Sequence, residues 1–119
     1  MGTILLIDDS KLSRLKTSKY IRNAGYDVIE AENGQVGLEL AIREHPDCIV
    51  CDILMPVMDG FEFTRRFKET GSDIPIIIMT ADIQNSTRER IKKLGSSIVL
   101  TKPPKEEALI EAIESSITL

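Results

Sequence analysis

The chain has 119 residues, which is enough for one compact domain with one hydrophobic core and too few for two ordinary domains. Hydrophobic residues make up 42% of the sequence, charged residues make up 29%, and the net charge of −4, with no stripe of Lys and Arg, argues against binding to nucleic acid. The apolar runs are too short to span a bilayer and the N-terminus has no basic leader segment, so we expect no membrane association and a cytoplasmic location.

Short apolar runs that predict strands alternate with segments of helical spacing. The predicted strands, in chain order, are Thr3–Ile7, Asp27–Glu30, Cys48–Cys51, Pro75–Met79 and Ile98–Leu100. The predicted helices run from about residue 11 to residue 24, from Gly34 to about Glu44, from Gly60 to just before Gly71, through Ile83, Thr87, Ile91 and Leu94, and through Ile110, Ile113 and Ile117. Three of these helices stop at a glycine, as expected where the chain turns left-handed after a helix.

This alternation predicts an α/β fold with a five-stranded, doubly wound parallel sheet. The strands are continuous apolar runs, as a sheet that is covered on both faces requires. Right-handed crossover connections leave only a few topologies, and the pattern by itself does not fix the order of the strands.

Cys48 and Cys51 form a C-x-x-C pattern, which suggests a redox pair or half of a zinc site. Both lie in one predicted strand, where residues three apart point to opposite faces and are roughly 10 Å apart. That separation is too long for a disulfide. A strand is also not the helix N-terminus that activates redox cysteines, and the chain has only one histidine to complete a zinc site. We therefore expect two buried core cysteines.

Polar side chains follow four of the predicted strands. Asp8 and Asp9 follow the first strand, Asp52 follows the third, Thr80 the fourth and Lys102 the fifth. In a doubly wound sheet these positions gather at the carboxyl edge, where α/β domains build their sites. Each residue alone has an ordinary explanation, such as a helix cap, a turn or a solvated lysine. The five together predict a functional site.

Three carboxylates in one place repel one another, and one ammonium group does not balance them. Hard oxygen ligands that leave room for water favour Mg²⁺. An ionised carboxylate needs no general base to act as a nucleophile, and phosphoryl transfer requires mainly positioning and neutralisation of charge. We therefore predict that Asp52 accepts a phosphoryl group. Asp9 and Asp52 would bind Mg²⁺, and Asp8 would act through a coordinated water. Lys102 would supply positive charge, and Thr80 would donate a hydrogen bond to the phosphoryl group.

Four segments resemble the receiver domains of bacterial two-component response regulators. They are Leu6–Ser10, Asp52–Gly60, Met79–Ala81 and Thr101–Pro103, and they spread over essentially the whole chain. The resemblance implies one CheY-like receiver domain over residues 1–119, with the flavodoxin-like strand order 2-1-3-4-5. It also implies that the backbone carbonyl of Leu54 completes the Mg²⁺ site and that the peptide bond before Pro103 is cis.

By the same resemblance, the phosphoryl donor is a phosphohistidine of a histidine kinase or phosphotransfer protein, or a small acyl phosphate. The protein would then be a signalling switch that catalyses only its own phosphorylation and dephosphorylation. The signal would appear on the surface of the fourth helix, fifth strand and fifth helix, where an unidentified downstream target binds. Opposite charges on that surface would also allow a weak homodimer. The charged residues are Arg88, Arg90, Lys92 and Lys93 on the fourth helix and Glu106, Glu107, Glu111 and Glu114 on the fifth.

The sequence departs from the family pattern at two positions near Lys102. Val99 stands where the family often has an aromatic switch residue, and Pro104 stands where it often has Phe. Leu54 and Asp82 occupy the two variable positions that flank the phosphoryl group in the family. We hypothesise that this pair sets the rate of dephosphorylation.

Three other functions compete with this interpretation. A phosphatase of the haloacid-dehalogenase type needs a second Asp two residues after the nucleophile, where Leu54 stands. A flavodoxin-like flavin carrier needs a phosphate loop rich in Ser, Thr and Gly after the first strand, where Asp8 and Asp9 would repel a flavin phosphate. An interaction domain that has the receiver shape and works without phosphorylation stays open.

Overall fold

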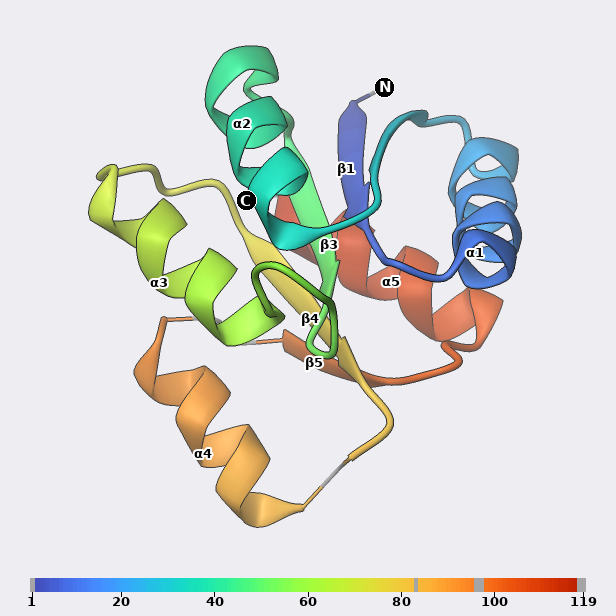
Figure 1. Ribbon diagram of the computed structural model, residues 1–119. Helices are drawn as coiled ribbons and strands as arrows, with labels where there is room; N and C mark the ends of the chain where they lie inside the picture. The colour runs from blue at the N-terminus through green and yellow to red at the C-terminus, as the bar shows by residue number, and fades with distance from the viewer. Residues whose placement is uncertain (1, 83, 96–97, 118–119) are drawn as a thin grey trace.

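A computed structural model of the chain describes residues 2–82, 84–95 and 98–117 (Figure 1). Strands and helices alternate in the predicted order. The strands are β1 (Thr3–Ile7), β2 (Asp27–Ala31), β3 (Cys48–Asp52), β4 (Ile76–Thr80) and β5 (Ile98–Thr101). The helices are α1 (Lys11–Asn23), α2 (Gly34–Glu44), α3 (Gly60–Glu69), α4 (Asn85–Lys93) and α5 (Glu106–Ile117). Ile83, which the helical spacing assigned to the fourth helix, lies outside the described residues.

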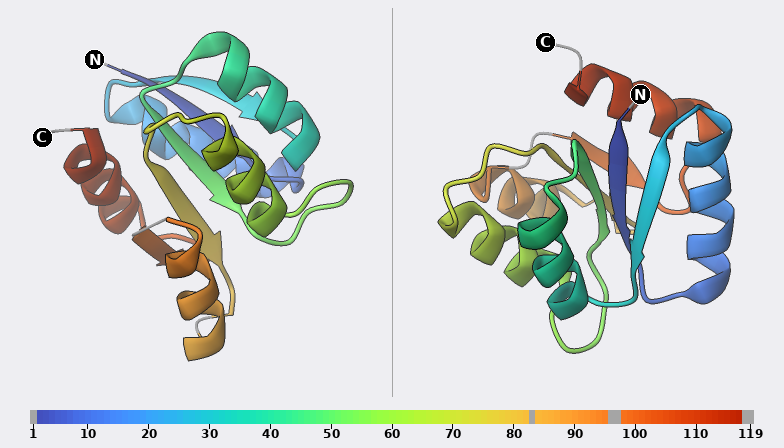
Figure 2. Two further views of the ribbon diagram at one scale, coloured as in Figure 1. Left: turned by 90° about the vertical axis from the view of Figure 1, so that its left-hand side faces the viewer. Right: turned by 90° about the horizontal axis from the view of Figure 1, so that it is seen from above.

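The strands form one parallel sheet in the order β2-β1-β3-β4-β5. This confirms the doubly wound α/β fold and the strand order implied by the family resemblance. Helices α1 and α5 cover one face of the sheet, and α2 and α3 cover the other (Figure 2). Every residue of β3 and β4 is buried, because these strands have neighbours on both sides and helices on both faces. None of the described helices has the length and apolar character needed to cross a bilayer.

Each face of the sheet carries its own hydrophobic core. Phe63 and Phe67 of α3 stack with ring centroids 5.8 Å apart in the core under α2 and α3. Cys51 belongs to this core, whereas Cys48 belongs to the core under α1 and α5. The two thiols are free and buried on opposite faces, as predicted from the strand, and burial raises the pKa of Cys48 to about 12. The C-x-x-C pattern is therefore structural.

The helices begin and end at residues with suitable local chemistry. Ser10, Asn33 and Asp59 cap α1, α2 and α3 by accepting a hydrogen bond from the backbone N–H three residues later. The cap of α1 is thus Ser10, and both Asp8 and Asp9 are left for other interactions. Gly71, after α3, adopts φ +84°, the left-handed conformation that the sequence predicted there.

The register of the sheet brings the predicted site residues level with one another. Ile7 pairs with Cys51, Asp52 pairs with Met79, and Thr80 pairs with Thr101. Asp52 and Thr80 are the last residues of their strands rather than the first residues of loops, because the ladder continues past them. The Ile53 N–H donates to the Met79 carbonyl at 3.2 Å, and the Lys102 N–H donates to the Thr80 carbonyl at 2.8 Å. The sheet therefore fixes the backbone at Asp52 and Thr80.

Gly60 begins α3 directly against the end of β3. A Cβ atom on Gly60 would stand 2.4 Å from the Asp52 carbonyl oxygen and 2.8 Å from the Ile53 Cα, and both are backbone atoms. Because the sheet holds this backbone in place, we expect Gly60→Ala to lower the free energy of unfolding by about 2–3 kcal/mol. Urea denaturation measures the loss.

Gly71→Ala is the matched control for this variant. A Cβ atom on Gly71 would have no neighbour within 4 Å, so the change introduces only the strain of a positive φ. We expect it to cost about 1 kcal/mol. Equal losses in the two variants would mean that the close approach of α3 to Asp52 carries no extra constraint.

Candidate functional site

The structure brings three carboxylates together at the carboxyl edge of the sheet. Asp8, Asp9 and Asp52 each offer a carboxylate oxygen, and these oxygens all lie within 4.8 Å of one another. Asp8 is fully buried, Asp52 is 4% exposed, and Asp9 is exposed. The cluster therefore has two carboxylates fixed inside the protein and one that faces solvent.

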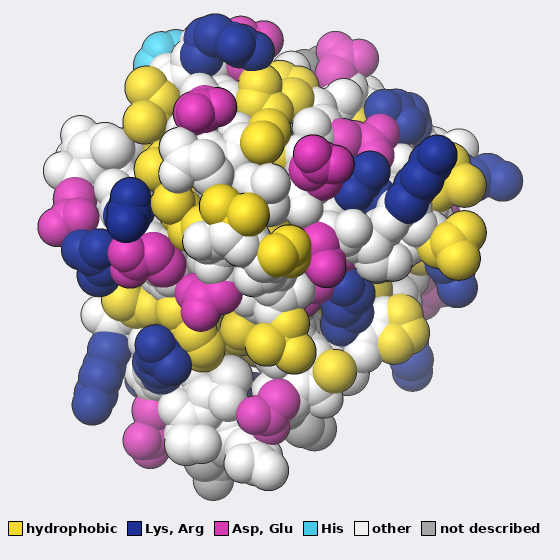
Figure 3. Space-filling view, in the orientation of Figure 1, with side chains coloured by type: hydrophobic (Ala, Val, Ile, Leu, Met, Phe, Trp, Pro, Cys, Tyr) yellow, Lys and Arg dark blue, Asp and Glu magenta, His cyan; other side chains and the backbone are white. Residues whose placement is uncertain are grey.

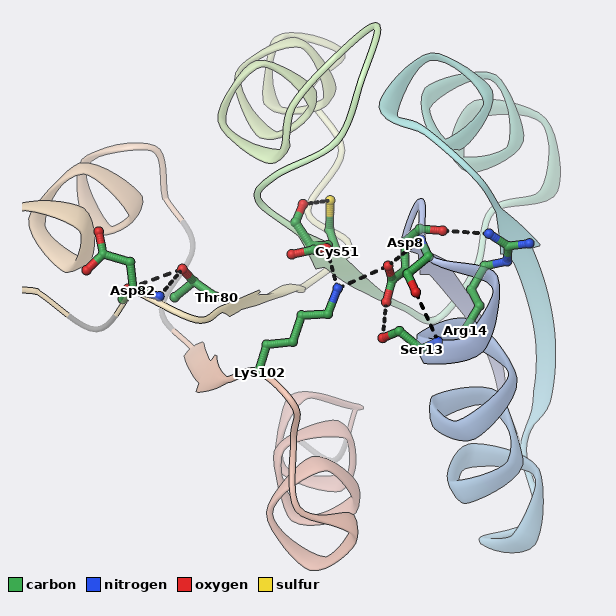
Figure 4. Close-up of polar contacts among 9 residues, drawn as sticks. Asp8, Ser13, Arg14, Cys51, Thr80, Asp82 and Lys102 are labelled. Atoms are coloured by element: carbon green, nitrogen blue, oxygen red, sulfur yellow. Dashed lines mark hydrogen bonds and ion pairs between the residues drawn. The ribbon is translucent and has the colours of Figure 1, made fainter.

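Lys102 reaches this cluster from the end of β5 (Figure 4). Its Nζ donates to Asp52 Oδ2 at 2.5 Å and to Asp8 Oδ1 at 3.1 Å. The Lys102 backbone is itself tied to β4 through its hydrogen bond to the Thr80 carbonyl. Lys102 thus contacts one carboxylate at the end of β3 and one just after β1. The sequence pattern of a single strand does not show this contact.

The electrostatics of the cluster are unbalanced. Burial raises the pKa of Asp52, and the hydrogen bond and positive charge of Lys102 lower it without fully offsetting the burial. For Lys102, burial lowers the pKa, but the hydrogen bonds from its ammonium to Asp52 and Asp8 outweigh that effect and raise it overall. One ammonium among three carboxylates leaves net negative charge. Together with the hard oxygen donors, this fits a divalent cation such as Mg²⁺.

Asp8 is held in place by groups at the start of α1. The Ser13 hydroxyl donates to Asp8 Oδ2 at 2.6 Å, and the Ser10 N–H donates to Asp8 Oδ1 at 3.0 Å. The Arg14 guanidinium donates to the Asp8 backbone carbonyl at 2.8 Å. The sequence pattern did not indicate Ser13 and Arg14, because their contacts with Asp8 depend on how α1 folds back over the end of β1.

Thr80 points away from the carboxylates in this structure (Figure 4). Its side chain is buried, and its hydroxyl donates to the Asp82 carbonyl at 3.1 Å and accepts from the Asp82 N–H at 3.0 Å. The Asp82 carboxylate in turn accepts from the Gln84 N–H at 3.0 Å and from the Thr87 hydroxyl at 2.9 Å. The predicted contact of Thr80 with a phosphoryl group therefore requires its hydroxyl to leave Asp82.

The loop between β3 and α3 forms one side of the site. The Leu54 side chain is 79% exposed, so any contribution of this residue to metal binding has to come from its backbone. Val57 adopts φ +70° with its side chain 81% exposed, a strained conformation for a β-branched residue. The Lys102–Pro103 peptide bond is cis, as the family resemblance implied. Pro104 is buried, and Val99 is half-buried against the core under α2 and α3.

Charges of both signs share the surface. On the face drawn in Figure 3, Lys and Arg side chains are interspersed with Asp and Glu rather than gathered in one basic area. The Arg90 guanidinium lies 3.8 Å above the Phe61 ring, which links α4 to α3 within the chain. This engages one of the four basic residues that the homodimer prediction relied on, and the homodimer itself stays a prediction.

Comparison with known proteins gives a consistent picture. The sequence model of a family described as the response regulator receiver domain matches residues 4–114. Protein PilH of Pseudomonas aeruginosa is 38% identical over 117 residues, which is 97% of this chain and 97% of that protein. Response regulator MprA of Mycobacterium leprae is 36% identical, and the match covers 94% of this chain but only 49% of that protein.

Solved structures are similar to this chain over nearly its whole length as well. The chemotaxis protein CheY4 of Vibrio cholerae superimposes with a TM-score of 0.92 at 30% identity, over 98% of each chain. The receiver domain of the Francisella response regulator 1452 gives a TM-score of 0.94 at 26% identity, over 98% of this chain and 97% of that one. The similarity thus covers the fold and nearly the full length of the chain.

Removing the charge of Asp52 should stabilise the metal-free protein. Because burial raises the pKa of Asp52, keeping this carboxylate ionised costs free energy. With a chelator at pH 7, we expect Asp52→Asn to raise the free energy of unfolding by about 1 kcal/mol. The gain should vanish below pH 3.8, the ordinary pKa of the group, because there the folded and unfolded wild-type proteins both carry the proton.

Urea denaturation across this pH range measures the effect. Asp73→Asn is the control, because Asp73 is exposed and the substitution removes the same formal charge. A loss of stability in Asp52→Asn at pH 7 would show that the ion pair with Lys102 outweighs the cost of burial.

Proposed function

The chain belongs to the response regulator receiver domain family, and we propose that it is a phosphorylation switch whose acceptor is Asp52. Receiver domains are signalling domains of two-component systems rather than metabolic enzymes. The observation that carries the proposal is the meeting of Asp8, Asp9 and Asp52 within 4.8 Å, with Lys102 in contact with two of them. Here Asp52 is the carboxylate at the end of the most central strand.

The proposed reaction is phosphoryl transfer from a phosphohistidine. A carboxylate oxygen of Asp52 attacks phosphorus, the P–O bond forms, the P–N bond breaks, and its electron pair stays on the imidazole nitrogen of the donor. The donor is a histidine kinase or phosphotransfer protein, and a small acyl phosphate can replace it. Mg²⁺, when bound, supplies positive charge to the phosphoryl oxygens. Lys102, which contacts Asp8 and Asp52, adds a second positive charge.

The proposed ligands follow from exposure and position. Asp52 and Asp9 bind the cation directly, since Asp9 is open to solvent and Asp52 ends β3 beside it. Asp8 acts through a coordinated water, because its carboxylate is fully buried and already accepts three hydrogen bonds. The carbonyl of Leu54 completes the set from the loop after β3. We also propose that residues 1–119 act as one receiver domain in the cytoplasm.

The signal is proposed to leave the site through Thr80. When the Thr80 hydroxyl turns to donate to the phosphoryl group, it gives up both hydrogen bonds to the Asp82 backbone. Asp82 also organises the start of α4, where Gln84 provides no side-chain cap of its own. Once Asp82 no longer binds the Thr80 hydroxyl, its hydrogen bonds with the Gln84 N–H and the Thr87 hydroxyl weaken. The surface of α4, β5 and α5 then changes although Val99 provides no aromatic ring.

Phosphorylation itself is tested with acetyl phosphate. In the presence of Mg²⁺ we expect intact mass spectrometry to show the gain of one phosphoryl group, because an acyl phosphate can replace the protein donor. Asp52→Asn should abolish the gain and a chelator should prevent it, whereas Asp73→Asn should behave like wild type. If neither acetyl phosphate nor a phosphorylated histidine kinase gives the gain, the chain is an interaction domain that works without phosphorylation.

The route through Asp82 is tested by hydrogen exchange. We expect phosphorylation to speed amide exchange in peptides covering residues 84–95 by about tenfold, the effect of about 1.4 kcal/mol of lost local stability. Thr87→Ala should produce faster exchange in these peptides without phosphorylation, because it removes the side-chain partner of Asp82.

Ser86→Ala is the control, since it changes an exposed hydroxyl on the same helix. Unchanged exchange in Thr87→Ala, or the same increase in Ser86→Ala, would contradict the route.

A further inference from the structure

The buried carboxylate of Asp8 depends on one side chain from α1. Ser13 Oγ donates to Asp8 Oδ2 at 2.6 Å, the shorter of the two hydrogen bonds that the Asp8 carboxylate receives from side chains. The other comes from Lys102, at 3.1 Å to Oδ1. Figure 4 shows Ser13 and Lys102 reaching Asp8 from different elements. A hydroxyl donating to a carboxylate at this distance forms a strong, charge-assisted hydrogen bond.

The start of α1 explains why Ser13 is free to do this. In a common helix start, the side chain three residues after the cap reaches back to the N–H of the cap residue. Here Ser10 is the cap and accepts from the Ser13 N–H at 3.3 Å. The Ser10 N–H, however, donates to Asp8 Oδ1 instead. Asp8 thus takes the place of the usual reciprocal partner, and the Ser13 hydroxyl is directed to its second oxygen.

Two fixed donors on two different oxygens determine the rotation of a carboxylate. The backbone N–H of Ser10 and the ammonium of Lys102 both donate to Asp8 Oδ1, and Lys102 is also shared with Asp52. Ser13 is the donor dedicated to Asp8 Oδ2. Without the Ser13 hydroxyl, Oδ2 loses the hydrogen bond that sets its direction. A carboxylate that acts through a coordinated water has to present its remaining lone pair in a defined direction. Groups that orient ligands in this way strongly affect metal affinity.

We infer that Ser13 is a positioning residue of the Mg²⁺ site, which acts by fixing the orientation of the Asp8 carboxylate. The inference rests on the proposed function, because it takes the cluster of Asp8, Asp9 and Asp52 as a cation site. It adds to that function a residue of α1 that lies outside the three carboxylates, the threonine and the lysine. It also couples the first turn of α1 to the cation.

The test is the affinity of the metal-free full chain for Mg²⁺. Titration with MgCl₂, followed by ¹H–¹⁵N NMR shifts, should give a dissociation constant about tenfold higher for Ser13→Ala than for wild type, at the low end of the effect of groups that orient metal ligands. Ser13→Thr keeps the hydroxyl and should restore most of the affinity. The Mg²⁺ concentration for half-maximal phosphorylation by acetyl phosphate should rise by the same factor in Ser13→Ala. The rate at saturating Mg²⁺ should be retained.

Ser116→Ala is the matched control, because the Ser116 hydroxyl also makes a short helical hydrogen bond, 2.7 Å to the Ala112 carbonyl, but lies on α5. Its Mg²⁺ affinity should equal that of wild type. The backbone spectrum of Ser13→Ala shows whether the variant is folded before metal is added. A small change in global stability does not alter the affinity of protein that stays folded.

The outcomes separate the inference from the function beneath it. If wild type binds Mg²⁺ and Ser13→Ala binds it equally or more tightly, Ser13 does not position the site and the proposed switch is unaffected. If Ser13→Ala and Ser13→Thr are weakened alike, the hydroxyl is not responsible and the inference fails. If wild type binds no Mg²⁺, both the inference and the proposed cation site fail.

Discussion

At the carboxyl edge of the sheet, the Lys102 ammonium contacts Asp8 and Asp52 at the same time, while Asp9 adds a third carboxylate nearby. Two of these acids are buried, where like charges interact strongly and desolvation penalises ionisation. One ammonium group holds the cluster together without neutralising it. This unbalanced charge is what makes the site suited to a cation and to the negatively charged phosphoryl group that a cation would stabilise.

Such a cluster persists only on a rigid support. β3 and β4 are buried along their whole length, and Asp52 and Thr80 end these strands within the hydrogen-bonded ladder. Helix α3 begins against the Asp52 carbonyl through Gly60, where a larger residue has no room. The hydrophobic cores on both faces therefore determine the spacing of the polar groups. The free energy that holds the site residues in place comes from the burial of apolar side chains in these two cores.

Two hydroxyl groups near the cluster have different partners. The Ser13 hydroxyl points inward and holds Asp8, so it belongs to the resting geometry of the site. The Thr80 hydroxyl points outward and is paired with the backbone of Asp82, so it stands between the site and α4. A fixed donor on one side and an exchangeable donor on the other suit a switch. In the proposed switch, the first would keep the geometry of the site constant, and the second would report phosphorylation to the surface.

The sequence by itself determined the order of the elements, the burial of both cysteines and the strand ends that carry Asp8, Asp52 and Lys102. These features depend on local periodicity and on the identity of a single residue at a strand terminus, which short stretches of sequence encode. The strand order came from the family resemblance, because right-handed crossovers allow several orders and periodicity does not choose among them.

Only the tertiary structure decided how Ser13, Thr80 and Arg90 are used. Ser13 reaches Asp8 because α1 folds back over β1, and Arg90 stacks on Phe61 because α4 packs beside α3. Thr80 is predicted to move towards the phosphoryl group, and only the structure shows that its hydroxyl would have to leave the Asp82 backbone to do so. These contacts depend on the angle at which a helix leaves a strand and on the rotamer of one side chain. Both follow from packing across the whole domain, which no local pattern in the sequence contains.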